Sequence, residues 1–141
     1  FVFQIIFIEN ILTLIKFYSI MLIENIGGNI MEVFIHHIYE YQKGIRNLIL
    51  HTTEKENIDF IKNKLNAENI SFIIYPLGCN RINVFFGAKE CVEVIKNIDK
   101  PSLTTYTPEE DFMLGIMLGY DRRRQCERYL KFKEREKIKI A

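Results

Sequence analysis

The sequence predicts an α+β fold, a three-stranded sheet with about five helices packed on it. Two observations lead to this class. Short apolar runs bounded by turn residues indicate strands, whereas longer segments carry apolar residues at every third or fourth position, as helices do when one face lies on a core. From Met31 onward the predicted order is helix, strand, helix, strand, strand, helix, helix, helix. The helices are expected to cover the sheet.

The first helix is predicted over residues 32–43 and the first strand over residues 46–51. The helical stripe consists of Phe34, Ile38, Tyr41 and Ile45. Their intervals of four, three and four place them on one face of a helix, and Gly44 is the kind of residue that ends one. The strand RNLILH has an unbroken apolar centre, which is typical of a strand covered on both faces.

The second helix and a hairpin are predicted in the middle of the chain. Thr53 and Glu56 stand at the spacing of a capping box, which predicts a helix over residues 54–66. The runs ISFIIYP and INVFFG, residues 70–76 and 82–87, have the composition of strands. LGCNR between them supplies the Gly and Asn of a turn, so these two strands are expected to pair with each other.

Three further helices are predicted after the hairpin. Residues 88–98 carry apolar side chains at helical spacing up to a DKP break. Thr107, Pro108 and Glu110 then supply a capping hydroxyl, a proline at the first helical position and the acid of a capping box. Asp121 is predicted to cap the last helix, which continues into the basic tail KFKEREKIKI.

The composition indicates one globular domain with a balanced charge. The chain has 141 residues, of which 48% are hydrophobic, and a formal net charge of +1. This balance argues against nucleic acid as a partner. Three cysteines without a CxxC pair argue against a disulfide framework or a thiolate zinc site, and favour a cytoplasmic location. No cofactor motif is present, so no cofactor is predicted.

Residues 1–30 are predicted to be an N-terminal extension, separate from a domain of residues 31–141. They are rich in Ile, Phe, Leu and Asn, with charges inside every window long enough to span a membrane. One interpretation is an amphipathic segment lying on the fold or on a membrane surface. The favoured one is translated upstream sequence, because the codons of Gly27 and Gly28 can form a ribosome-binding stretch ahead of Met31. No membrane contact is predicted without this extension.

Three sequence blocks carry a resemblance to a known family: HHIYEYQKGIRNLILHT, GCNRINVFFG and TPEEDFMLGIMLGYDRRRQCERYL. Together they resemble DUF2023, a small bacterial family known as a domain of unknown function, over about residues 31–135. The resemblance implies a compact fold of three strands and about five helices that forms a homodimer. It also implies genes that can lie beside flavodoxin genes, which hints at a redox context. No activity or site residue comes with it.

The histidines are weak candidates for a metal site. Adjacent helical residues point about 100° apart, so His36 and His37 cannot bind one metal together. His37 falls at the margin of the apolar stripe and His36 on the solvent side. A pair of His37 with His51 is possible if the first helix packs over the first strand, but no carboxylate or thiolate completes the set. No metal site is therefore predicted, and pH sensing is the alternative.

Cys126 has two interpretations. It lies one turn ahead of Tyr129 and Leu130, which predicts a place on the buried face of the last helix, where a cysteine behaves as a small hydrophobe. It also follows the start of that helix and lies near Arg122, and both features lower a thiol pKa. A reactive thiol is the alternative to a structural one.

The other two cysteines differ in their expected environment. Cys91 lies on the apolar stripe of its helix and is predicted to be in the core. Cys79 lies in the hairpin turn, where exposure and the neighbouring Arg81 would favour the thiolate. A turn cysteine without a role is the simpler interpretation.

The densest charge cluster is Asp121 followed by Arg122, Arg123 and Arg124. The three arginines spread over about 200° of the helix, so they cannot form one phosphate clamp. One of them is suited to bind a carboxylate of an acidic partner. An ion-paired helical surface is the simpler interpretation.

The favoured function is a self-associating protein-binding module without catalysis. The helix that begins at Pro108 has more apolar surface than a three-stranded sheet can cover, and exposed apolar surface is typical of an interface. A twofold homodimer is the commonest solution. The predicted interface residues are Phe112, Met113, Ile116 and Met117. The alternative is a redox-linked accessory protein that acts with flavodoxin, or through a reactive cysteine.

Overall fold

The predicted order of elements is confirmed over residues 29–141, the part of the chain that the computed structural model describes. The extension predicted over residues 1–30 lies outside this part except for its last two residues. Residues up to Ile38 and residues Tyr39–Ala141 form two units, each described by itself. The helices are α2 (Asn29–Gln42), α3 (Ile58–Ala67), α4 (Lys89–Ile98), α5 (Pro108–Met117) and α6 (Arg122–Ile140). The strands are β1 (Leu48–Glu54), β2 (Ser71–Leu77) and β3 (Arg81–Gly87).

The three strands form one antiparallel sheet in the order β1-β3-β2. The hairpin of β2 and β3 is confirmed, and β1 pairs with the other edge of β3. Because β3 is central, its residues from Ile82 to Gly87 are all buried. Pro76 has no N–H to offer the sheet, and it lies on an edge strand, where that donor is not required. The first strand was predicted to be covered on both faces, but β3 is the strand whose two faces are covered most completely.

The start of the second helix was predicted too early. The prediction took Thr53 as an N-cap, but β1 continues through Glu54, which pairs with Arg81 at the far end of β3. Thr53 is a buried strand residue whose hydroxyl accepts a hydrogen bond from Asn57 Nδ2 at 2.9 Å. A short 3₁₀ turn, Lys55–Asn57, separates β1 from α3. Cross-strand pairing thus prevails over a local capping pattern.

One apolar core lies between the sheet and helices α4 and α5. Its buried members are Leu48, Tyr75, Phe85, Val92, Ile95, Leu114 and Leu118. Phe85 pairs with Leu50 on one side and Ile73 on the other, so the three side chains stand on the same face of the sheet. Each fully buried side chain of this size contributes roughly 1.5–3 kcal/mol. This core therefore holds α4 and α5 on one face.

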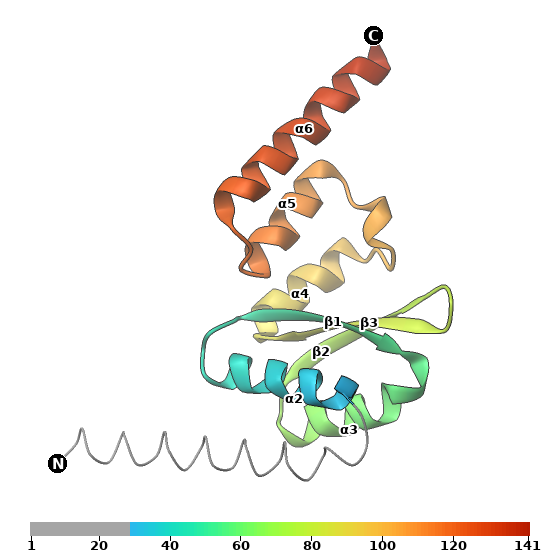
Figure 1. The fold of residues 1–141 in the computed structure, drawn as a ribbon, viewed down its shortest axis with the longest axis vertical. Helices are drawn as coiled ribbons and strands as arrows, with labels where there is room; N and C mark the ends of the chain where they lie inside the picture. The colour runs from blue at the N-terminus through green and yellow to red at the C-terminus, as the bar shows by residue number, and fades with distance from the viewer. Residues whose placement is uncertain (1–28) are drawn as a thin grey trace, which may run out of the picture. The chain divides into compact units, whose positions relative to one another are not determined.

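The other face of the sheet is turned toward α3. In Figure 1, α4 lies above the sheet and α3 below it. Ile49 and Phe86 pair across the two strands on this second face, and Ile61 and Leu65 are the buried residues of α3. α3 closes at Asn69, which has a φ of 57° and lets Ile70 donate its N–H to the carbonyl of Leu65 at 2.9 Å.

Gly44 ends α2 as predicted, through a Schellman motif. Its φ of 72° allows the N–H of Gly44 to reach the carbonyl of Tyr41, and the N–H of Ile45 to reach that of Glu40, each at 3.0 Å. Phe34 and Ile38 of the predicted stripe are buried. Ile45 was predicted to continue that stripe, and this is wrong, because the chain has left the helix there and the side chain is 65% exposed.

The capping box at the start of α5 is confirmed. Thr107 Oγ1 accepts a hydrogen bond from the backbone N–H of Glu110 at 3.2 Å, and Glu110 Oε2 accepts one from the backbone N–H of Thr107 at 2.9 Å. The same carboxylate accepts a second bond, from Lys100 Nζ at 2.6 Å. These donors hold the pKa of Glu110 below its usual range, with the contribution of Lys100 the largest.

Replacing Thr107 with alanine is expected to lower the free energy of unfolding by about 0.5–2 kcal/mol, because an N-terminal backbone N–H of α5 loses its acceptor. Thr107→Ser keeps the hydroxyl and is the matched control. Urea denaturation of both variants, compared at equal m-value, measures the difference. Equal midpoints for the two variants would show that the cap does not stabilise α5.

Candidate functional site

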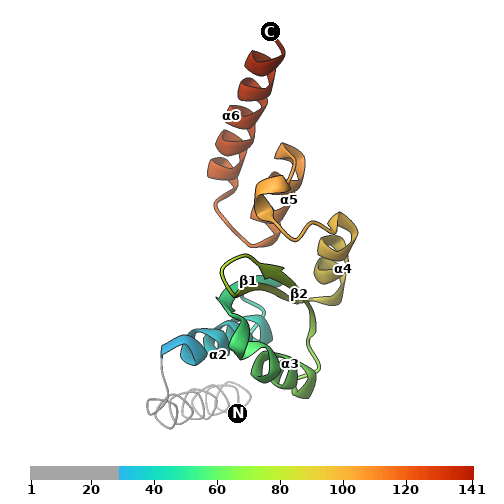
Figure 2. The ribbon, with the colours of Figure 1, turned by 90° about the vertical axis from the view of Figure 1, so that its right-hand side faces the viewer.

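α5 and α6 form an antiparallel pair held by charged groups. The guanidinium of Arg128 donates two hydrogen bonds to the carboxylate of Asp111, at 2.8 and 3.1 Å, and Lys133 Nζ donates one to Glu109 at 3.0 Å. The Asp111 carboxylate raises the pKa of Arg128, and Lys133 lowers the pKa of Glu109. The acids at the start of α5 also suit the positive end of its dipole. Figure 2 shows α6 continuing past the first turn of α5.

The side chains of α5 divide among three surroundings. Leu114 is buried in the core, and the Phe112 ring lies against Tyr129 of α6 with centroids 5.6 Å apart. Met113 is 44% exposed, while Ile116 and Met117 are half-buried. Of the four predicted interface residues, Phe112 thus belongs to the contact with α6, whereas Met113 and Ile116 form the outer face of α5. Met117 lies at the edge of that face and also packs against the core.

The outer face of α5 continues into a surface hollow of about 450 Å³. The hollow lies between the end of α5 and the turn that joins α2 to β1, and Ile116 and Met117 line it. Ile45 and Tyr120, 65% and 53% exposed, also line it. We call Ile45, Met113, Ile116, Met117 and Tyr120 the α5 patch. Ile45 and Tyr120 were not among the predicted interface residues. Ile45 reaches the end of α5 only through the fold, whereas Tyr120 lies in the turn that follows α5.

The start of α6 is capped as predicted. Asp121 Oδ1 accepts a hydrogen bond from the backbone N–H of Arg124 at 2.9 Å. Arg122 is exposed, and Arg123 is paired with Glu127 at 3.2 Å. Within residues 29–141, Arg123 is thus the one of the three arginines that makes an ion pair, which agrees with the prediction that they point in different directions around the helix.

Comparison with known families places the chain in a group defined by sequence. The family described as "Protein of unknown function (DUF2023)" matches residues 32–132, which include the whole sheet and helices α3, α4 and α5. The protein belongs to the DUF2023 family. A search of curated proteins gave no match. In the described part of this DUF2023 protein, every helix is too short or too polar to cross a membrane.

Two histidines of the DUF2023 protein are adjacent on α2, and the third lies in β1. His36 is exposed and His37 half-buried on α2, as predicted, and His51 is buried in β1. His37 and His51 belong to the two separately described units, so the ligand pair that was considered for them, and not predicted, stays a hypothesis. Among residues 29–141, no three His, Cys, Asp or Glu side chains come together in a way that could hold a metal ion.

The prediction that Cys126 is buried is wrong. α6 turns Tyr129 toward α5, and Gln125 lies so close to Gly115 that an added Cβ there would meet its side-chain oxygen. Cys126 points away from this contact and is exposed. The adjacent Leu130 is 59% exposed. The contacts of Tyr129 with Phe112 and of Gln125 with Gly115 therefore set the orientation of α6, and Leu130 takes no part in them.

The remaining thiols differ in burial, as expected. Cys79 is exposed in the hairpin turn, with a φ of 63°, and Arg81 beside it is also exposed. Cys91, predicted to be in the core, packs against it but is only half-buried, and burial raises the pKa of its thiol. A redox-linked role through Cys79 or Cys126 stays a prediction.

Two buried phenols were not anticipated from the sequence. The hydroxyl oxygens of Tyr75 and Tyr106 are shielded from solvent, and burial raises the pKa of both. The charge of Asp99, at the end of α4, raises the pKa of Tyr75 further. Both side chains contact the core cluster, so they are neutral, structural members of it.

Proposed function

We propose that this DUF2023 protein is a self-associating module that binds other proteins and has no catalytic role. The observation that carries the proposal is the α5 patch. Exposed and half-buried apolar side chains from α5, the turn after it and the turn before β1 gather there, and contiguous apolar surface of this kind is typical of interfaces.

The shape of the patch favours a second copy of the chain as its occupant. The patch combines projecting apolar side chains, Ile45 and Tyr120, with a hollow of about 450 Å³ directly beside them. A twofold axis brings the same patch of both copies face to face. Each copy can then insert its projecting side chains into the hollow of its mate, which removes apolar surface from water on both sides.

The surroundings of the patch are also compatible with burial. Arg46, the charged residue that lines the hollow, is paired with Glu40 at 3.3 Å. A charge that already has a partner costs less to desolvate than an isolated one. The ion pair therefore does not oppose apolar contact across the hollow.

The wild-type chain is expected to be a dimer at micromolar concentration, and Met117→Lys is expected to weaken association by bringing an unpaired ammonium into the contact. Leu130→Lys, which adds the same charge on α6 outside the patch, is the matched control. Light scattering coupled to size exclusion gives the mass of each. A monomeric wild type, or a Met117→Lys variant as dimeric as the control, would contradict the proposal.

A further inference from the structure

α6 has a large positive net charge, and the rest of the chain has a negative net charge that nearly cancels it. Residues 122–140 contain nine basic and three acidic side chains, whereas the whole chain carries a net charge of +1. None of these residues is buried. A charge so segregated on one exposed helix creates a local field, and such fields steer and select charged partners.

Five of the basic residues lie on one face of α6: Arg124, Arg128, Lys131, Arg135 and Lys139. Their spacing of four, three, four and four residues aligns them along the helix over roughly 22 Å. We call this row the α6 basic face. Within residues 29–141, Arg128 makes the only ion pair of the five, so four cations of the face remain available.

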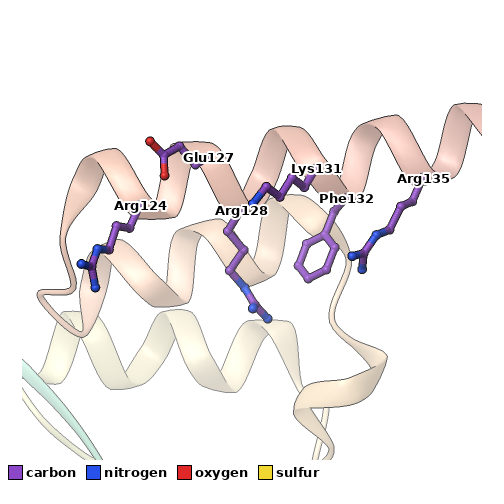
Figure 3. A pocket seen from close by; sticks show the side chains of 6 residues that line it. All are labelled: Arg124, Glu127, Arg128, Lys131, Phe132 and Arg135. Atoms are coloured by element: carbon purple, nitrogen blue, oxygen red, sulfur yellow. The ribbon is translucent and has the colours of Figure 1, made fainter.

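Two hollows along this face meet at Phe132. One, of about 260 Å³, is lined by Arg124, Lys131 and the flanking Arg128 and Arg135. The other, of about 320 Å³, shares Phe132 and Arg135 and adds Lys139. Figure 3 shows Arg124, Arg128, Phe132 and Arg135 projecting to the same side of α6.

Two of the three guanidinium groups of this face, those of Arg128 and Arg135, lie near an aromatic ring. The Cζ atom of Arg128 lies 4.6 Å from the centroid of Phe132, and that of Arg135 lies 6.0 Å from it. Such cation–π contacts restrict the arginine side chains before any ligand arrives. Less ordering is then required on binding, which favours affinity.

The chemistry of the face points to carboxylates as ligands. Arg128 already holds the Asp111 carboxylate through two hydrogen bonds, and this is the forked geometry in which arginine binds carboxylates most strongly. A phosphate backbone is a poorer match, because the whole chain carries a net charge of only +1.

We infer that the α6 basic face docks an acidic helix of another protein. The available cations Arg124, Lys131, Arg135 and Lys139 rise along the axis in steps of about 10, 6 and 6 Å. Carboxylates on one face of a second helix repeat with the same steps, so four ion pairs can form in one register. The inference rests on the protein-binding part of the proposed function and is independent of self-association through the α5 patch.

The test uses the full chain and a synthetic helical peptide whose glutamates have the spacing of these four cations. Binding is followed by fluorescence anisotropy at low and high salt. The double variant Lys131→Glu with Arg135→Glu is expected to bind the peptide at least about tenfold more weakly, since opposite charges become like charges. Arg123→Glu with Lys137→Glu changes the net charge equally on another face of α6 and is expected to keep most of the affinity.

Three further measurements make the test decisive. The same peptide with glutamine in place of glutamate is expected not to bind, and a single-stranded RNA is expected to bind more weakly than the acidic peptide. Sedimentation of the same samples is expected to show that both double variants have the same oligomeric state as the wild type. The inference is overturned by equal losses in the two variants, by tighter RNA binding, by binding of the glutamine peptide, or by no binding at low salt. It is also overturned if peptide binding is lost only together with the dimer.

Discussion

Replacing Gly87 with alanine is expected to destabilise the protein by about 3–5 kcal/mol, a loss large enough to unfold many small domains. Gly87 ends the central strand with a φ of 145°, a conformation that residues with a side chain rarely adopt. A Cβ at this position would lie 2.2 Å from the carbonyl oxygen of Asn47. That oxygen cannot move away freely, because it accepts the N–H of Ala88 at 2.8 Å.

Two other glycines separate the causes of this loss. Gly78 has neither a positive φ nor a neighbouring atom in the way, so Gly78→Ala is expected to be nearly neutral. Gly44 has a φ of 72° and open space, so Gly44→Ala isolates the backbone strain of about 1–2 kcal/mol. Urea denaturation of the three variants tests the close approach at Asn47. A Gly87 variant no less stable than the Gly44 variant would show that the approach costs nothing.

The parts of the fold that were predicted correctly depend on residues close together in the sequence. Thr107, Glu110 and Asp121 act on backbone groups within three positions, and Gly44 closes its own helix. Such local chemistry is legible in the sequence. The exact extent of β1 is not, because its last residues are strand only through pairing with β3.

The orientation of α6 shows a second limit of sequence reasoning. Tyr129 and Leu130 indicated a buried face that includes Cys126, but α6 is fixed by ion pairs to the first turn of α5 and by close packing at Gly115. In these two charged contacts the acid and the base are 17 and 24 residues apart in the sequence. A helix that packs through ion pairs, one ring contact and one glycine contact carries no continuous apolar stripe that would reveal its face.

The candidate surfaces were predicted in unequal measure. Met113, Ile116 and Met117 could be named from the composition of one helix. Ile45 comes from a turn that the fold brings beside that helix, and Tyr120 from the turn that follows the helix in the sequence. The basic residues of the α6 basic face recur at helical spacing, so the face could have been predicted from the sequence. The prediction considered instead the three consecutive arginines at the start of α6, which point in different directions around the helix.

Placing glutamate at both Ile45 and Tyr120 is expected to raise the dissociation constant of the homodimer at least roughly 100-fold, which corresponds to about 2.8 kcal/mol. Both side chains project from the α5 patch and are more than half exposed, so the change leaves the core intact. In a twofold contact each copy would bring two carboxylates into apolar surroundings, facing those of its mate. Leu130→Glu, equally exposed on α6, is the control for added negative charge.

Sedimentation velocity of the wild type, the Ile45→Glu/Tyr120→Glu variant and the Leu130→Glu control tests most directly whether the α5 patch joins two copies of this DUF2023 protein. Across micromolar concentrations the wild type and the control are expected to sediment as dimers, and the double variant as a folded monomer with unchanged circular dichroism. A wild type that sediments as a monomer, or a double variant that remains as dimeric as the control, would contradict self-association through the α5 patch.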